Sequence, residues 1–190
     1  VKMTTRTLFL FALLCVLLSA ACNNSDDTPT INEDLIGTWD LVSFQSEGDI
    51  STNFIVDITT NFTLSGQPLG NGYQVTFAEN TFSTQGDYNT TTTVSSLGVP
   101  PTTTTSDIIN VSGNGTYTNN GNGTITINEG SFYDFSVDGS DLNEVGGEQI
   151  SNFTINGDQL IFTTSQMETE TSMGITTTYD FTSTSTFVRN

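Results

Sequence analysis

Alternation of apolar and polar residues is the feature that most constrains the fold of this chain. The apolar members of each alternating segment are Phe54, Val56 and Ile58; Tyr73, Val75 and Phe77; Ile125 and Ile127; Tyr133, Phe135 and Val137; Phe153 and Ile155; and Leu160 and Phe162. Side chains at this period of two lie on one face of a half-buried β-strand. Helical periodicity is absent apart from a short turn that we expect at 33–36. The sequence therefore predicts an all-β protein.

Turn dipeptides that tolerate positive φ stand between the alternating segments. They are Asn71-Gly72, Asn114-Gly115, Asn122-Gly123, Asp138-Gly139 and Asn156-Gly157. The most distinct hairpin runs over 153–162, with Asn156-Gly157 at its turn. This regular spacing predicts an antiparallel meander of about eight to ten strands. Closing the meander into an up-and-down β-barrel would hide its edges, so we predict a barrel.

Two segments interrupt this pattern. Residues 59–70 mix apolar and turn residues. Threonine runs at 90–93 and 102–105 flank Pro100-Pro101. We interpret the runs as long exposed strand ends with the proline pair at a hairpin tip, and disorder is the alternative reading.

The charge of the chain restricts its partners and its chemistry. Lys and Arg number 3, Asp and Glu number 21, and the net charge is −18. A surface this acidic repels nucleic acid and anionic membranes. The chain has no His, and its two Cys are Cys15 and Cys22. Because the usual ligands are missing, we expect neither structural zinc nor any other metal or cofactor.

The first residues have the composition of an export signal. Lys2 and Arg6 precede an apolar run of roughly eleven residues, which is the length of a signal-peptide core and is too short to span a bilayer stably. Ser19-Ala20-Ala21-Cys22 follows and resembles a bacterial lipobox, in which the cysteine is acylated and becomes the new N-terminus. We predict a lipoprotein signal peptide at 1–21 and lipid attachment at Cys22; an ordinary secretory signal is the alternative.

Residues 22–33 are polar and acidic without periodicity, which indicates a flexible tether. An acidic stretch after an acylated cysteine resembles the surface-export signal of Bacteroidetes lipoproteins. That resemblance implies a lipoprotein anchored in the outer membrane of the cell envelope, with surface exposure as one option and a plain spacer as the other reading.

The start of the predicted domain, 34–190, carries a second resemblance. Gly37-Thr38-Trp39, followed by Leu41-Val42-Ser43-Phe44, is similar to the first strand of lipocalins and of lipocalin-like domains in bacterial lipoproteins. The resemblance implies a lipocalin-like barrel. The Thr-Asp-Tyr motif of classical lipocalins is absent. Trp39 and Leu41 oppose Phe44 in parity, so we expect a bulge in this strand or cover on both of its faces.

The two ends of the domain offer a matched pair of residues. Trp39 is the only Trp, and Arg189 is the only basic residue after the leader. In lipocalins an Arg near the C-terminus packs over the Gly-x-Trp ring, so the resemblance implies that Arg189 covers Trp39 and closes the barrel. Asp34 or Asp40 could pair with the guanidinium. A frayed terminal Arg is the alternative.

The composition disfavours catalysis. Without His, no Ser-His or Cys-His nucleophile can form. Carboxylate pairs of the glycosidase type are conceivable, but nothing singles out any pair. Residues 138–144 gather oxygen donors without the spacing of an EF-hand, and a plain acidic turn explains them better than calcium does. We predict that the protein is not an enzyme.

Two functions fit these observations. In the first, the barrel holds one small apolar or amphipathic ligand. Its cavity would be lined by Phe54, Tyr73, Phe77, Tyr133 and Phe135. In the second, these residues fill a solid barrel, and a surface lipoprotein works through exposed loops such as 95–106. In both cases we expect a monomer that meets the membrane only through its anchor.

Overall fold

A computed structural model describes residues 33–53, 57–133, 136–137, 140–141 and 149–190. The chain divides into two compact units, residues 1–30 and residues 31–190. The predicted leader, Cys22 and most of the tether lie outside the described residues, as do Phe54 and Phe135. Everything below concerns the second unit.

Antiparallel strands account for almost all of the described chain, which confirms the prediction of an all-β, antiparallel protein. One 3-10 turn, η1 (Glu33–Leu35), precedes them, near the position expected for a helical turn. The strands are β1 (Gly37–Asn53), β2 (Asp57–Phe77), β3 (Thr81–Ser96), β4 (Val99–Gly121), β5 (Thr124–Glu129), β6 (Ser136–Val137), β7 (Ser140–Asp141), β8 (Gln149–Asn156), β9 (Gln159–Ser172) and β10 (Ile175–Arg189).

Eight of these strands form one sheet that closes on itself. Around the ring the order is β1, β10, β9, β8, β5, β4, β3, β2, and β2 pairs again with β1. β6 and β7 pair with each other and, among the described strands, with no other. The first and last strands of the sheet close the ring, with Trp39 opposite Arg189 and Leu41 opposite Phe187.

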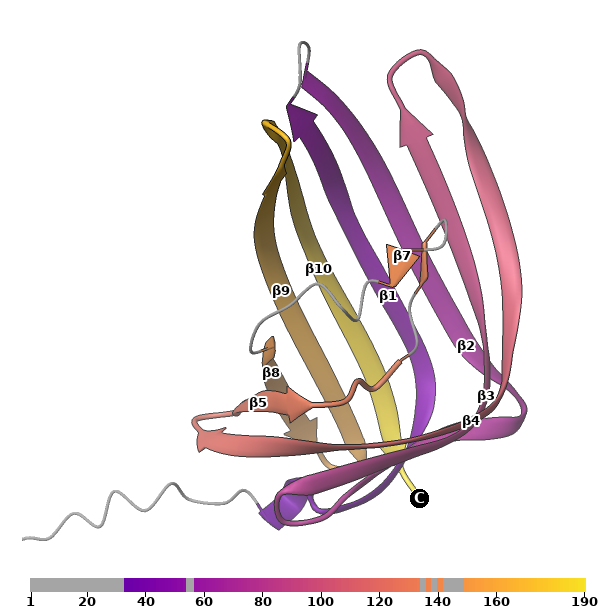
Figure 1. Ribbon diagram of the computed structural model, residues 1–190. Helices are drawn as coiled ribbons and strands as arrows, with labels where there is room; N and C mark the ends of the chain where they lie inside the picture. The colour runs from indigo at the N-terminus through magenta and orange to yellow at the C-terminus, as the bar shows by residue number, and fades with distance from the viewer. Residues whose placement is uncertain (1–32, 54–56, 134–135, 138–139, 142–148) are drawn as a thin grey trace, which may run out of the picture. The chain divides into compact units, whose positions relative to one another are not determined.

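The ring is complete over only part of its height. β5 has 6 residues and β8 has 8, whereas β2 has 21 and β4 has 23. Because the short strands meet the long ones near the base, β9, β10 and β1–β4 continue beyond the closed part (Figure 1). The described sheet therefore has a closed base and an open upper half of six strands.

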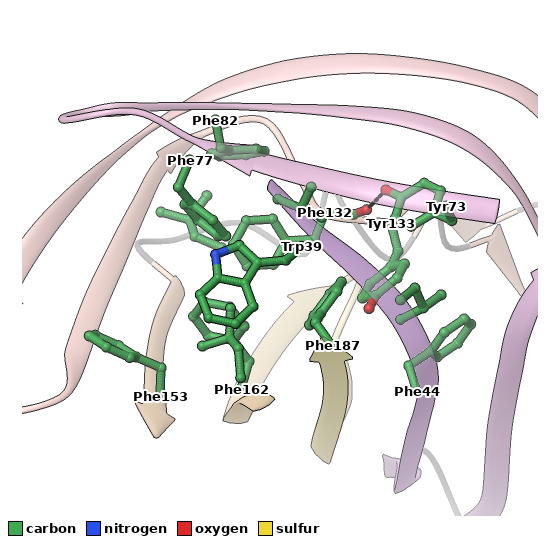
Figure 2. Close-up of a cluster of buried hydrophobic side chains, with 14 of the residues drawn as sticks. Trp39, Phe44, Tyr73, Phe77, Phe82, Phe132, Tyr133, Phe153, Phe162 and Phe187 are labelled. Carbon is green, nitrogen blue, oxygen red and sulfur yellow. Dashed lines mark hydrogen bonds between the residues drawn. The ribbon is translucent and has the colours of Figure 1, made fainter. Parts of the chain in front are cut away.

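Alternation explains the core of the base. Tyr73, Val75 and Phe77 of β2 are each buried, and the polar residues between them are not. Inward-facing rings from the other strands meet them (Figure 2). Phe77 contacts Tyr117, Phe132 and Phe162 with ring centroids 5.5, 5.6 and 5.7 Å away. The contacts with Tyr117 and Phe132 are edge-to-face, and such contacts add to the free energy gained by burying apolar area.

A β-bulge reconciles the two parities of β1, as expected from the sequence. The register with β10 shifts between Leu41 and Ser43. Trp39 and Leu41 are buried before the shift, and Phe44 and Ser46 are buried after it. The extra residue restores the inward direction, so one strand lines the interior along its whole buried length.

Two of the predicted turns do reverse the chain. Asn122 and Gly123 have φ of 53° and 74° and join β4 to β5 in a two-residue turn, which matches the type I′ requirement for positive φ. The hairpin at 153–162 is also confirmed, although its two-residue turn is Gly157-Asp158, since Asn156 already pairs with Gln159.

Other turn assignments are wrong. Asn71-Gly72 lies inside β2, where the register with β3 shifts, and the bare α-carbon of Gly86 fits against it: a Cβ there would lie 2.1 Å from the carbonyl oxygen of Gly72. Asn114-Gly115 lies inside β4, where Gly115 makes room for the ring of Phe82. The glycines are needed for close approach of chains and not for chain reversal.

The segment predicted as an exposed loop at 95–106 is a strand hairpin. Only Leu97-Gly98 forms its turn, and Pro100-Pro101 lies within β4 just after it. The Thr runs pair across β3 and β4, with hydroxyl contacts of 3.1 Å between Thr91 and Thr105 and 2.9 Å between Thr93 and Thr103. Residues 59–70, which broke the sequence pattern, belong to β2.

Candidate functional site

The segment after β5 enters the interior and forms the floor of the site. Gly130, with φ of 81°, redirects the chain, and a Cβ there would lie 2.6 Å from the carbonyl oxygen of Asn114. Phe132 and Tyr133 are then buried among the rings of the core. The Tyr73 hydroxyl donates to the carbonyl oxygen of Phe132, which fixes the inserted segment to β2 (Figure 2).

Tyr133 lies at the centre of this floor. Its ring centroid is 4.6 Å from that of Phe44, 5.8 Å from that of Tyr73 and 5.9 Å from that of Tyr88. Burial raises the pKa of the Tyr133 phenol well above its ordinary value, and a hydrogen bond with Ser185 partly offsets this. The phenol is therefore neutral at physiological pH.

A cavity of about 60 Å³ lies above this floor on the inner face of the sheet. Register places its walls in two rows across β2, β1, β10 and β9: Phe62, Gly48, Phe181 and Gln166 in one, and Leu64, Ser46, Ser183 and Thr164 in the other. Rows from neighbouring strands bring these distant residues together. We call this arrangement the mouth site.

Gly48 sets the spacing of the two rings of the mouth site. Phe62 and Phe181 lie on either side of it, with ring centroids 6.5 Å apart. A Cβ at Gly48 would lie 2.5 Å from the Cβ of Phe181 and 2.3 Å from the carbonyl oxygen of Asp180. The absent side chain therefore lets Phe181 lie close over β1, as aromatic residues often do beside strand glycines.

The lining of the mouth site is half apolar and half polar. Its apolar members are Phe62, Leu64, Ile127, Phe132, Phe162 and Phe181. Hydroxyls and amides provide the rest, chiefly from Ser46, Gln149, Ser151, Thr164, Gln166, Ser183 and Ser185. None of the described lining residues is charged. Chemically, such a surface suits a neutral molecule with one apolar side.

The residues that the sequence suggested for a ligand cavity lie in different parts of the structure. Tyr73 and Phe77 are 1% and 2% exposed and belong to the packed core, and neither is among the described residues that line the mouth site. Tyr133 does line the mouth site. Phe54 and Phe135 are outside the described residues. Sequence reasoning missed Phe62, Leu64 and Phe181, although Phe62 and Leu64 alternate with polar residues within 59–70.

Trp39 and Arg189 lie in contact at the base. The guanidinium carbon of Arg189 is 4.3 Å from the ring centroid of Trp39. Its nitrogens donate to the backbone oxygens of Asp34, at 2.5 Å, and Ile36, at 3.4 Å. The indole nitrogen of Trp39 donates to the carbonyl oxygen of Leu35 at 2.9 Å. These bonds tie the turn η1 to both closing strands.

Gly37 explains the Gly-x-Trp pattern in physical terms. Its φ is 136°, which L-residues rarely adopt, and a Cβ there would lie 3.2 Å from a guanidinium nitrogen of Arg189. Asp40, one of the two suggested ion-pair partners, instead accepts hydrogen bonds from the amides of Gln74 and Asn190. Arg189 is therefore held by the indole and by backbone oxygens.

The chain was compared with known protein families, curated proteins and solved structures. No family model, curated protein or solved structure matches this chain. The described residues contain no group of three or more Asp, Glu, Cys or His side chains placed to hold a metal ion. Among the same residues, no helix has the length and hydropathy needed to cross a bilayer.

Proposed function

We propose that this protein is a lipocalin-like, non-catalytic lipoprotein of the bacterial outer membrane that binds a small, uncharged amphipathic ligand at the mouth site. The observation that carries the proposal is the lining of that site, where apolar rings face hydroxyls and amides and none of the described residues is charged. Neutral polar groups orient a ligand while the rings bury its apolar part. The ring topology and the Trp39–Arg189 contact support the lipocalin-like assignment.

The size of the cavity decides how the ligand would bind. About 60 Å³ holds only part of a small molecule, and drug-sized ligands need roughly 300–1,000 Å³. The rings of Phe77, Phe132 and Tyr133 fill the space below. The ligand would therefore insert one apolar end between Phe62 and Phe181 and leave the rest among the hydroxyls of the open upper half.

Titration of the full-length protein with two soluble lipids tests this function. Monolauroyl glycerol has a neutral diol head, whereas laurate carries a charged head on the same chain. We expect calorimetry below the critical micelle concentrations to show binding of monolauroyl glycerol and at least tenfold weaker binding of laurate. Equal affinity for both, or no heat with either, would contradict the proposal.

A pair of variants locates the binding. Phe181→Ser removes a ring of the mouth site and should weaken binding of monolauroyl glycerol about tenfold, which corresponds to about 1.4 kcal/mol. Ile150→Ser is the control, because Ile150 is 54% exposed on β8 and does not line the mouth site. An unchanged affinity in Phe181→Ser would place the ligand elsewhere.

The filled base favours a second candidate, a surface lipoprotein with a solid interior. Trp39, Tyr73 and Phe77 are at most 2% exposed, so the base itself offers no room for a ligand. Native mass spectrometry of protein purified from its own host separates the two candidates. A retained small molecule supports the binding function, and its consistent absence together with failed titrations supports the second.

The anchor has its own test. Replacing Cys22 with Ser should move the protein from the membrane fraction to the soluble fraction, because two or three acyl chains anchor stably and none does not. A Cys15→Ser variant is the control. Continued sedimentation of Cys22→Ser with membranes would contradict the proposed lipid attachment.

A further inference from the structure

The long strand β4 has a backbone edge that its neighbours leave uncovered. It pairs with β3 from Val99 to Thr116, but with β5 only from Thr116 to Gly121. Within the part of the chain that the structure describes, residues 99–115 therefore have no strand on the second side. Alternate residues along such an edge present their N–H and C=O groups to a chain that approaches in an extended conformation.

Beside this edge lies a cleft of about 540 Å³. It forms where the chain turns inward at Gly130, so that residues 130–133 separate from β4. Its apolar lining comes from Ile108, Val111, Phe132 and Tyr133, while Tyr73 and Thr84 lie at its inner side. Ile109, which is 62% exposed, extends the apolar surface outward.

Two features of β4 limit the length of the usable edge. Pro100 and Pro101 lack N–H donors at its start. A bulge at Ile109–Asn110 shifts the register with β3, Asn110 has φ of 58°, and its N–H donates to the Asp87 carboxylate at 2.7 Å. The edge beside the cleft is therefore short, and it suits a segment of a few residues better than a second long strand.

Acidic residues lie next to the lining residues of the cleft, either along the chain or through a hydrogen bond. Asp107 directly precedes Ile108, Glu129 directly precedes Gly130, and Asp87 binds the backbone of Asn110. No basic side chain is among the described lining residues. In a chain with net charge −18, the field at the cleft favours a cationic partner.

We propose that this cleft, which we call the β4 cleft, binds an extended peptide segment of another protein by strand addition. The peptide pairs with the free edge of β4 at 108–113, and an apolar side chain enters between Val111 and Phe132. Basic residues at the alternate positions lie near Asp107 and Glu129. Backbone pairing supplies affinity and the apolar pocket supplies selectivity, as in other β-augmentation sites. The β4 cleft shares Ser131, Phe132 and Tyr133 with the mouth site but has its other wall in β4, and its occupant is a peptide.

Three nonapeptides that alternate valine with a second residue test the proposal on the full-length protein. The first alternates valine with lysine, the second with glutamate, and the third repeats the first with alternate backbone nitrogens methylated. We expect calorimetry to show binding of the lysine peptide only, with at least tenfold weaker binding of the other two. Equal binding of the methylated peptide would overturn strand addition, and equal binding of the glutamate peptide would overturn the charge argument.

Hydrogen exchange and two variants place the peptide. Binding should slow amide exchange at 108–113 and leave it unchanged at 91–95. Val111→Lys should weaken binding at least tenfold, whereas Val99→Lys, on the same strand but outside the cleft, should not. Circular dichroism checks that both variants fold. Slow exchange at 108–113 in the free protein, together with no binding, would show that this chain covers its own edge and would overturn the proposal.

Discussion

The long strands run through both the closed base and the open upper half of the sheet, but their inward side chains differ between the two regions. In the base, most inward positions carry a ring or an aliphatic side chain, and Trp39, Phe77 and Phe187 are at most 2% exposed. In the upper half, hydroxyl-bearing residues replace most of them, as at Ser46 and Ser183. Apart from the register shifts within β1 and β2, side chains alternate in direction along β1, β2 and β10, so the chemistry of the inward residues separates a core from a surface.

This difference teaches where stability and binding reside. Burial of apolar area is the main favourable contribution to folding, and it is concentrated in the base. Cross-strand hydroxyl contacts hold the upper half, such as the 3.1 Å contact between Ser165 and Thr182 and the 3.2 Å contact between Thr169 and Thr178. Each such pair contributes little, about 0.2–1 kcal/mol. The upper half can therefore change its inner face without loss of the fold.

Truncation of a base residue should have the largest effect. Phe77→Ala removes a ring that contacts four other rings, and we expect it to lower the free energy of unfolding by about 3–5 kcal/mol. Phe181→Ala, at the half-buried mouth site, should cost less than about 1.5 kcal/mol, because less area leaves contact. Urea denaturation measures both. Equal losses would mean that the two halves contribute alike to stability.

Alkaline pH should lower the stability of the closed base of the sheet, where the phenols are buried. Burial raises the pKa of the phenols of Tyr73 and Tyr133; hydrogen bonds with Thr84 and Ser185 partly offset this rise, and neighbouring tyrosines add to it. The unfolded chain releases these protons near pH 10, while the folded chain retains them. Stability is therefore complete below about pH 10 and falls as pH rises toward the folded pKa, by about 1.4 kcal/mol per pH unit for each phenol.

Ultraviolet absorbance of the phenolate checks this expectation. Ionisation of the buried phenols should coincide with loss of the near-ultraviolet circular dichroism that reports packing. Tyr133→Phe, which cannot ionise at this position, should show a shallower decline of unfolding free energy above pH 10. An equal decline in both proteins would contradict a contribution from Tyr133.

Substitution of two glycines of β2 by alanine compares a tightly packed position, Gly66, with an open one, Gly70. A Cβ at Gly66 would lie 2.2 Å from the Phe44 ring and 2.3 Å from the carbonyl oxygen of Asn89, whereas a Cβ at Gly70 would meet nothing within 4 Å. Gly66→Ala should cost about 1–3 kcal/mol through overpacking. Gly70→Ala should change stability by less than about 0.5 kcal/mol. Thermal melts of the two variants side by side measure the difference.

Part of this architecture could be predicted from the sequence because it depends on local pattern. The alternation at 73–77, the bulge after Leu41 and the hairpin at 153–162 all follow from neighbouring residues. The parity of β1 also indicated that something must interrupt the strand. The contact between Trp39 and Arg189 joins two residue types that are nearly unique in the domain. Their rarity allowed the pair to be predicted although the two residues are far apart in the sequence.

The remaining features of the fold depend on contacts between residues that are far apart in the sequence. Gly66 and Pro68 break the alternation of β2, and the reason lies in the ring of Phe44 and in the neighbouring strand β3. Asn-Gly signals that positive φ is tolerated, but it does not reveal whether the chain reverses, so Asn114-Gly115 was misassigned. The inward turn at Gly130, which creates both the mouth floor and the β4 cleft, has no sequence signal beyond one glycine.

The closing contact at the base should have an intermediate effect. Arg189→Ala removes the guanidinium from Trp39 and from the backbone oxygens of Asp34 and Ile36, and we expect a loss of about 0.5–2 kcal/mol. Val188→Ala, one residue earlier and 38% exposed, is the control and should change stability by less than about 0.5 kcal/mol. A negligible effect of Arg189→Ala in urea denaturation would show that the closing strands need no such cap.

The smallest effect concerns charge in the upper half. Asp49 of β1 lies directly opposite Asp180 of β10, and Glu47 is two residues from Asp49 on the same face. Like charges in directly opposed positions destabilise a sheet, so Asp180→Asn should raise the free energy of unfolding by at most about 1 kcal/mol at low salt. Asp107→Asn is the control, because Asp107 lies opposite the uncharged Asn89.

Salt separates this repulsion from other effects of the same substitution. Screening shortens the range of exposed charges to about 8 Å at physiological ionic strength and about 3 Å at 1 M. The advantage of Asp180→Asn should therefore shrink as salt is added, while the melting temperature of the unaltered protein rises. An advantage that persists at 1 M salt would mean that the aspartate is unfavourable for a reason other than its charge. Since the base holds its rings without any such pair of opposed acids in the described register, this sensitivity to salt should belong to the upper half.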